Sequence, residues 1–255
     1  MRIEQVSDGV PPLFELIDLR SDVPDVMERH ALCHEFFETV YRHAFLKPDQ
    51  TETPAVWLPL LDHDHPPPAP LLHLIVASRR DTPEGRGAVV GGIVVEYFRR
   101  SRTALATYLA VRSDERHHGL ARRLLADATQ RVSMDNGGTP PLLFAEVERP
   151  EAQSGEAAQR SALGRLAIIA ALGGRKVDLD YIQPRLGAHQ EALDDLMLVL
   201  LAPKGEVRDT IPTATVRAFL EEFFSSLGQR DTVEFERVLG SMAAERIALK
   251  DLTHP

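Results

Sequence analysis

The stretch from Leu105 to Leu125 constrains the fold of this 255-residue chain more than any other part of it. The apolar run 105–111 predicts a strand, and the charged residues 112–118 predict a turn. Apolar residues then recur at the spacing of an amphipathic helix: Leu120, Leu124, Leu125, Ala128 and Val132. We therefore expect a strand, a short turn and a helix that begins at Gly119.

The turn itself has the properties of an anion site. It reads Arg116-His117-His118-Gly119-Leu120-Ala121, or R-x-x-G-x-A. The first N–H groups of a helix are unpaired, and the helix dipole favours an anion beside them. Gly119 permits a backbone conformation or a close approach that a side chain would forbid, and the small Ala121 leaves the helix start open. The surrounding basic residues add positive charge: Arg116, His117, His118, Arg122 and Arg123.

This stretch resembles the acyl-CoA-binding motif of the GCN5-related N-acetyltransferase (GNAT) family, Q/R-x-x-G-x-G/A between a strand and a helix. The resemblance implies that acetyl-CoA is the cosubstrate and that the turn holds its pyrophosphate. It also implies that main-chain groups of the preceding strand bind the pantetheine arm where that strand splays from its neighbour. The implied cofactor-binding residues are Leu109, Ala110, Val111, Arg116, His117, His118, Gly119, Leu120, Ala121 and Arg122. The alternative is that 109–111 is only a core strand.

The order of elements over roughly residues 10–203 is strand, helices, three strands, helix, strand, helix and two strands. Strands and helices alternate only in part, which predicts an α/β fold with a mixed sheet. The resemblance implies the GNAT version of it, a twisted sheet with a splayed central strand pair. We assign residues 1–203 to this domain. Residues 204–255 carry two apolar helical faces and no predicted strand, so we expect a C-terminal helical extension that packs on the domain or on a second subunit of a homodimer.

Acyl transfer to an amine requires a group that removes a proton from the amine. Glu146 and Glu148 lie two residues apart on one predicted strand and so face the same side of the sheet. Apolar neighbours on that face would raise the pKa of Glu146 toward that of a useful base. Glu96, on a different predicted strand, is the rival base.

The acid that protonates the leaving thiolate is harder to assign. The resemblance implies a tyrosine on the helix that follows the strand of Glu146, about four residues before its closing glycine, Gly173, but Ile169 occupies that position. Tyr181 is the nearest substitute, and an enzyme without a dedicated acid is the alternative.

Composition narrows the function class. The net charge of −9 argues against a nucleic-acid surface and is compatible with a cationic acceptor. The single cysteine, Cys33, gives neither a disulfide nor a zinc pattern. His30, His34 and Glu38 have metal-compatible spacing, but His30 lies on an apolar stripe, so we expect packed side chains and no metal. Residues 1–12 lack a signal-peptide core and no apolar run could span a membrane, which predicts a cytoplasmic protein.

The sequence therefore predicts an acyl-CoA-dependent N-acyltransferase, most simply one that acetylates a primary amine of a small molecule or peptide. The absent tyrosine keeps a second interpretation open, a non-catalytic acyl-CoA-binding or sensor module. The sequence does not name the acceptor.

Overall fold

A single mixed sheet organises the chain. The computed structural model describes residues 14–80, 86–116, 118–201 and 208–252. Within these ranges the sheet has nine strands in the order β1-β2-β3-β4-β5-β7-β6-β9-β8. The strands are β1 Phe14–Asp18, β2 Leu71–Arg79, β3 Val89–Phe98, β4 Thr103–Val111, β5 Leu142–Glu148, β6 Gly174–Val177, β7 Leu196–Leu201, β8 Thr210–Pro212 and β9 Arg246–Asp251.

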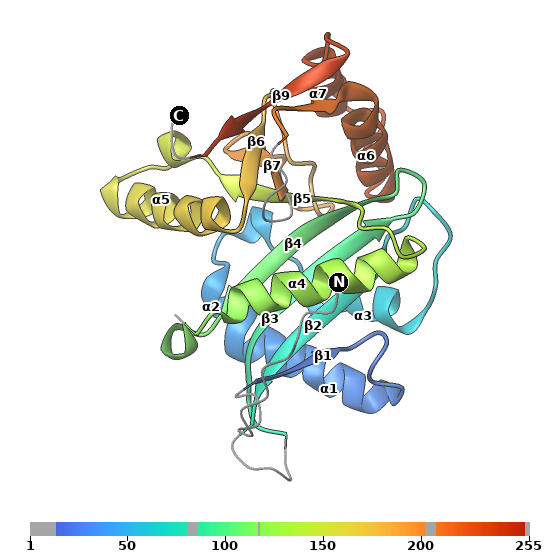
Figure 1. Ribbon diagram of the computed structural model, residues 1–255, viewed down its shortest axis with the longest axis vertical. Coiled ribbons are helices and arrows are strands. Elements are labelled where there is room, and N and C mark those ends of the chain that lie inside the picture. The colour runs from blue at the N-terminus through green and yellow to red at the C-terminus, as the bar shows by residue number, and fades with distance from the viewer. Residues whose placement is uncertain (1–13, 81–85, 117, 202–207, 253–255) are drawn as a thin grey trace.

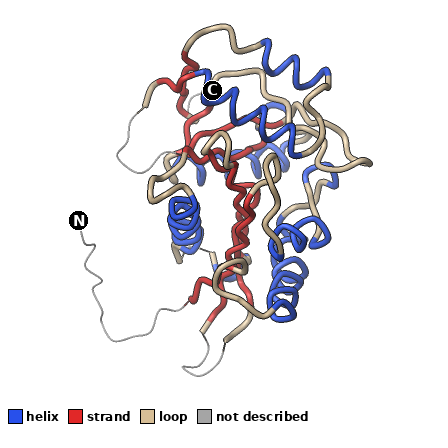
Figure 2. Tube along the Cα trace, turned by 90° about the vertical axis from the view of Figure 1, so that its right-hand side faces the viewer, coloured by secondary structure: helices blue, strands red, loops and turns tan. Residues whose placement is uncertain are grey.

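Helices cover both faces of this sheet (Figures 1 and 2). They are α1 Val26–Phe36, α2 Arg42–Ala44, α3 Pro54–Asp62, α4 Leu120–Asp135, α5 Glu156–Ala171, α6 Thr213–Ser226 and α7 Val233–Gly240. The buried stripe of α4 packs on one face, while α1 and α3 pack on the other with Val94 and Tyr108. A π-helical turn, Phe37–Tyr41, joins α1 to α2. No described helix is long and apolar enough to cross a membrane.

The predicted α/β class, element order and mixed sheet are confirmed. Neighbouring strands are antiparallel except β4 and β5, which run parallel. The strand that follows α5 is short, because β6 ends at Val177. Beyond it the backbone makes tight turns, with Leu179 N–H donating to Val177 and Tyr181 N–H donating to Leu179.

The central strands β4 and β5 splay apart. Their parallel ladder stops at Ala106 opposite Ala145. On the other side of β4, Tyr108 pairs with Val94 and Ala106 with Val95, so Thr107 is an extra, bulged residue. A bulge bends its strand and increases its twist. Beyond it, the edge of 107–111 that faces β5 has no strand partner among the described residues.

The C-terminal segment contains the two expected helices, but the expectation that it lacks strands was wrong. β9 pairs with β6 and β8 pairs with β9, so the segment extends the sheet. The alternation in β9, where Ile247 and Leu249 are buried between exposed neighbours, is a strand pattern that the helical interpretation overlooked. The apolar face of α6 packs on the sheet of the same chain, where Phe219 stacks on Phe144 at 4.6 Å between ring centroids.

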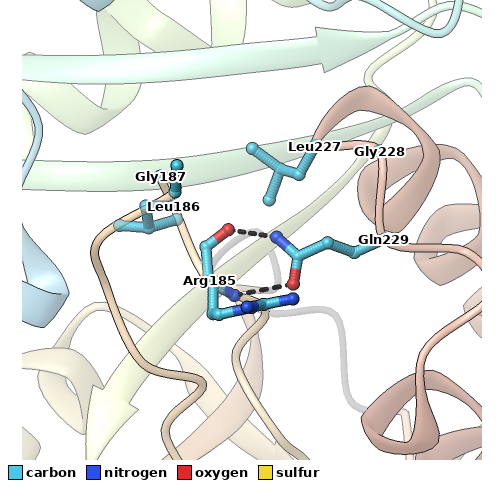
Figure 3. Close-up of a pocket in the computed structure, with 7 residues that line it drawn as sticks. Arg185, Leu186, Gly187, Leu227, Gly228 and Gln229 are labelled. Carbon is cyan, nitrogen blue, oxygen red and sulfur yellow. Dashed lines mark hydrogen bonds between the residues drawn. The ribbon is translucent and has the colours of Figure 1, made fainter.

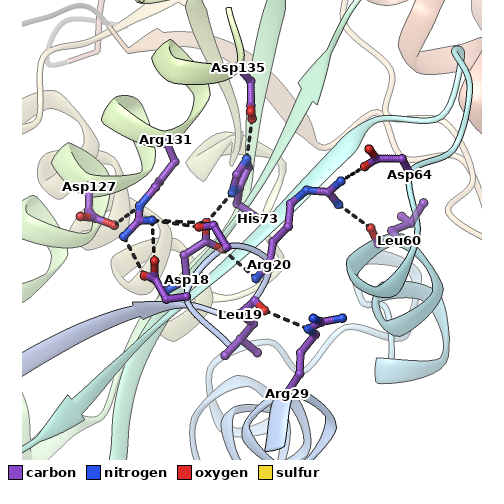
Figure 4. Close-up of polar contacts among 12 residues, drawn as sticks. Asp18, Leu19, Arg20, Arg29, Leu60, Asp64, His73, Asp127, Arg131 and Asp135 are labelled. Atoms are coloured by element: carbon purple, nitrogen blue, oxygen red, sulfur yellow. Dashed lines mark hydrogen bonds and ion pairs between the residues drawn. The ribbon is translucent and has the colours of Figure 1, made fainter. Parts of the chain in front are cut away.

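A buried histidine joins β1, β2 and the end of α4 (Figure 4). His73 Nδ1 lies 2.7 Å from Asp18 Oδ2, and its Nε2 lies 2.7 Å from Asp135 Oδ2. Burial lowers the pKa of His73, but the hydrogen bonds and charges of Asp135 and Asp18 outweigh burial and raise it to about 9. The imidazolium is thus an internal ion partner for two carboxylates.

Because of this arrangement, we expect the folded protein to lose stability at alkaline pH. The folded protein holds the His73 proton more tightly than the unfolded chain, where the pKa is near 6.5. The stabilisation is therefore complete below pH 6.5 and is lost as the pH rises through 9. Relative to His73→Gln, we expect the wild-type free energy of unfolding to fall by about 2–3 kcal/mol across that window in denaturant titrations. Parallel pH profiles for the two proteins would contradict this assignment.

Candidate active site

The start of α4 has the expected backbone geometry. Gly119 is the N-cap residue, with φ of 70°, a left-handed conformation that side chains disfavour. A Cβ atom added there would meet no atom within 4 Å, and the first turn of α4 carries no acidic residue. The helix start thus has open space at Gly119 and no carboxylate within its first turn, which suits an anion.

Basic side chains surround this helix start. Arg116 is exposed, and its Nε donates to the carbonyl of Val111 at 3.3 Å. His118 is exposed, with Nδ1 3.8 Å from Glu115. Arg122 reaches the carbonyl of Ala171 at the end of α5. Leu120 is buried beneath them and Ala121 is partly buried, whereas His117 lies outside the described residues.

The residues present fit coenzyme A. Leu109, Ala110 and Val111 lie on the unpaired edge of β4, which offers backbone groups to an extended, amide-containing chain. The edge leads toward the α4 N-terminus, which suits the pyrophosphate. The binding roles of these residues and of the turn remain predictions.

The two predicted catalytic side chains meet. The Tyr181 hydroxyl donates a hydrogen bond to Glu146 Oε1, although the residues come from a loop and from β5. Burial raises the pKa of Glu146 to about 7, with a smaller contribution from the charge of Glu52, while the Tyr181 hydrogen bond opposes the increase. Tyr181 is buried, and burial together with the Glu146 charge raises its pKa well above 10, so it stays protonated.

Glu96, the alternative base, lies in β3, on the side of β4 that faces away from β5. Glu96 in β3 accepts a hydrogen bond from the hydroxyl of the bulged Thr107 at 3.2 Å. Burial, followed by the charge of Glu52, raises the pKa of Glu96 to about 8, and the charge of Glu146 adds to this. Glu96 and Glu146 thus lie close enough for their charges to interact, and both are candidates for the base.

A third carboxylate, Glu52, was not predicted. Its Oε2 accepts a hydrogen bond from Trp57 Nε1 at 3.0 Å, and its N–H donates to the Tyr41 hydroxyl at 2.9 Å. Burial raises its pKa. Glu52 lies in the polar stretch before α3, where no local pattern marks it. Only the fold brings it to Glu96 and Glu146.

One loop positions both Tyr181 and the Glu52 segment. The loop 178–195 is closed by a bridge between Gln183 and Leu193, and Gln190 Nε2 donates to the carbonyl of Thr51 at 2.8 Å. Near the middle of this loop, Arg185 is held by Gln229, which follows α6. The Gln229 side chain accepts a hydrogen bond from the Arg185 backbone N–H and donates one to the Arg185 carbonyl (Figure 3). A surface pocket of about 390 Å³ lies here, lined by residues 185–188 and 227–229, and contains none of the predicted catalytic residues.

Three other positions named from the sequence have structural contacts. Glu148 pairs with Lys47 at 2.8 Å and with Arg165, so it is not a free base. Ile169 packs beside α4 and the sheet, and its side chain cannot donate a proton. His30 contacts Asp62 at 2.7 Å, and no group of three or more potential metal ligands occurs within the described ranges.

No protein-family model and no curated protein matches this sequence. Several solved structures are similar to this chain. A candidate acetyltransferase of the GNAT family from Bacteroides thetaiotaomicron has 18% sequence identity, covers 84% of this chain and 98% of its own length, and superimposes with a TM-score of 0.52. A GNAT-family candidate from Desulfovibrio desulfuricans has 19% identity, coverage of 74% and 98%, and a TM-score of 0.45. A candidate acetyltransferase from Salmonella typhimurium, solved with acetyl-CoA, has 16% identity, coverage of 76% and 96%, and a TM-score of 0.43. From the first of these and the splayed mixed sheet, we conclude that the chain has the GNAT fold.

Proposed function

We propose that this protein transfers an acetyl or short acyl group from acetyl-CoA to a primary amine. One observation carries the proposal. The splay between β4 and β5 has an anion-compatible helix start at one end and the Glu146–Tyr181 pair close to where the ladder stops. A donor lying along the free edge of β4 would bring its reactive end toward those side chains.

Acetyl-CoA supplies an acyl group activated as a thioester. The acceptor amine is protonated at neutral pH and must lose a proton before it can attack. Glu146, with a pKa of about 7, is matched to this task, because an efficient base titrates near the working pH. Glu96, with a pKa of about 8, is the alternative acceptor for the same proton.

Tyr181 takes two roles in this proposal. Its hydroxyl fixes the orientation of the Glu146 carboxylate, and it retains a proton that can pass to the leaving thiolate. Tyr181 would thereby take the role of the tyrosine that the family resemblance implies at the position of Ile169. A non-catalytic acyl-CoA sensor would need neither role, so a measurement of catalytic activity distinguishes the two functions.

The direct test is thiol release from acetyl-CoA by the purified protein with a panel of primary amines. Release that depends on both the amine and the protein supports the transferase. Saturable acetyl-CoA binding without release for any amine supports the sensor module.

The cofactor site is tested by Gly119→Glu. We expect acetyl-CoA binding, measured by calorimetry, to weaken at least about 30-fold, because a carboxylate would stand where the pyrophosphate is expected. Gly119→Ala is the matched control, since it introduces the same backbone strain without the charge. Undiminished binding by Gly119→Glu would refute the assignment of the site.

A further inference from the structure

We propose that the acceptor is a small di- or polyamine, whose second cationic amine binds Glu52 and the Tyr108 hydroxyl while the first reacts beside Glu146 and Glu96. This inference rests on the proposed function and specifies the acceptor that the same site takes.

The first observation is a cluster of three carboxyl groups without a cationic partner. Glu52, Glu96 and Glu146 come from three separate segments and act on one another, yet no cation is among the groups that shift their pKa values. No described lysine, arginine or histidine forms an ion pair with any of the three. Carboxylates that are shielded from water without a cationic partner are costly to the fold, even when they accept single hydrogen bonds. A ligand that supplies positive charge would recover that cost.

The second observation is an unsatisfied hydroxyl. Tyr108 is only 4% exposed and points into the same cluster, where the charges of Glu52 and Glu146 act on it. Its hydroxyl lies beside Glu52 and Tyr41 and lowers the pKa of Glu52, yet it makes no hydrogen bond of normal geometry with any residue that the structure describes. Buried polar groups are rarely left in this state without a ligand or water. An ammonium group can donate to this oxygen and to Glu52 together.

The surroundings of Glu52 strengthen its attraction for a cation. Tyr41, Trp57 and Tyr108 form an apolar wall, with ring centroids 4.9 Å apart for Tyr41–Trp57 and for Tyr41–Tyr108. Electrostatic attraction is stronger beside such a wall than in open water. Glu52 Oε2 accepts the Trp57 hydrogen bond, and the Tyr108 hydroxyl lies beside the same carboxylate.

The arrangement favours two separate cations over one multivalent ion. No three acidic or imidazole side chains within the described ranges converge closely enough to share a metal ion. The cluster thus offers carboxyl groups spread over several positions, which ammonium groups at both ends of a flexible molecule would hold in the charged form. A monoamine could supply a positive charge beside Glu146 and Glu96 but none beside Glu52.

The test compares n-butylamine with the diamines 1,3-diaminopropane to 1,6-diaminohexane in the thiol-release assay. We expect kcat/KM for the best diamine to exceed that for butylamine by about 10–30-fold, beyond the statistical advantage of its two amines, as one added charge contact would give. Glu52→Gln should bring this ratio near unity. Glu236→Gln, which removes one exposed carboxylate from α7, should preserve it.

Calorimetric titration of the same amines into the cofactor-free protein separates this inference from the proposed function. Diamine binding that Glu52→Gln weakens would support the cationic subsite even if no amine released thiol. Equal kcat/KM for mono- and diamines, or a diamine preference that survives Glu52→Gln, would overturn the subsite and leave the transferase standing. No diamine binding together with no turnover would overturn both.

Discussion

Glu146→Gln lowers the rate of acyl transfer by about 10²–10⁴-fold and leaves the affinity for acetyl-CoA nearly unchanged, if Glu146 is the base. The amide keeps the size of the side chain and its ability to accept the Tyr181 hydrogen bond, but it cannot take a proton. Single-turnover rates and calorimetric binding of acetyl-CoA measure the two effects separately.

The pH profile identifies the base. The carboxylate is the active form, so kcat/KM in the wild type should rise as the pH passes about 7 and Glu146 loses its proton. Glu146→Gln should lose this acidic limb. If instead Glu96→Gln abolishes the limb, which would then lie nearer pH 8, the role belongs to Glu96.

Stability provides the control for this variant. The folded protein raises the pKa of Glu146 from 4.5 to about 7, so it binds that proton more tightly than the unfolded chain does. The contribution to stability is present below pH 4.5 and is lost as the pH rises through 7. Glu146→Gln should therefore be at least as stable as the wild type at pH 8. A variant that is inactive and also less stable at that pH would speak against a specific catalytic role.

The local parts of this site could be predicted from sequence. The turn before α4 combines a glycine that needs positive φ with a helix start and basic neighbours, all within a few consecutive residues. Glu146 was predictable because alternation along β5 places it on a defined face. Tyr181 was reached by elimination, and its contact with Glu146 depends on the loop 178–195, which no periodic pattern describes.

The rest of the site depends on contacts between distant segments. Glu52 precedes Glu96 by a helix and a strand, so nothing local relates them. The bulge at Thr107, which bends β4 where the splay opens and brings a hydroxyl to Glu96, has no signature in the apolar run that predicts the strand. The strands β8 and β9 were overlooked because the apolar faces of α6 and α7 dominate that segment.

Phe223→Asp tests whether the C-terminal segment is part of the folded unit. Phe223 is 3% exposed and packs against both Phe98 and Phe219, with ring centroids 5.9 Å and 5.7 Å away. The substitution removes this packing and buries a carboxylate among aromatic rings. We expect the free energy of unfolding to fall by more than about 4 kcal/mol in denaturant titrations. Ala214→Asp is the control, because it places the same charge at an exposed position in the first turn of α6, where the helix dipole tolerates it.

Truncation after Pro203 should have a still larger effect, for two physical reasons. It removes the aromatic face that covers Phe98 and Phe144, and it removes β9, which pairs with β6 at the edge of the sheet. An exposed apolar surface beside an unpaired strand edge promotes aggregation. Light scattering should therefore show aggregates of the truncated protein. A truncated protein that remained monomeric, active and fully stable would show that the sheet ends functionally at β6, and that the segment 204–255 is an accessory to the fold.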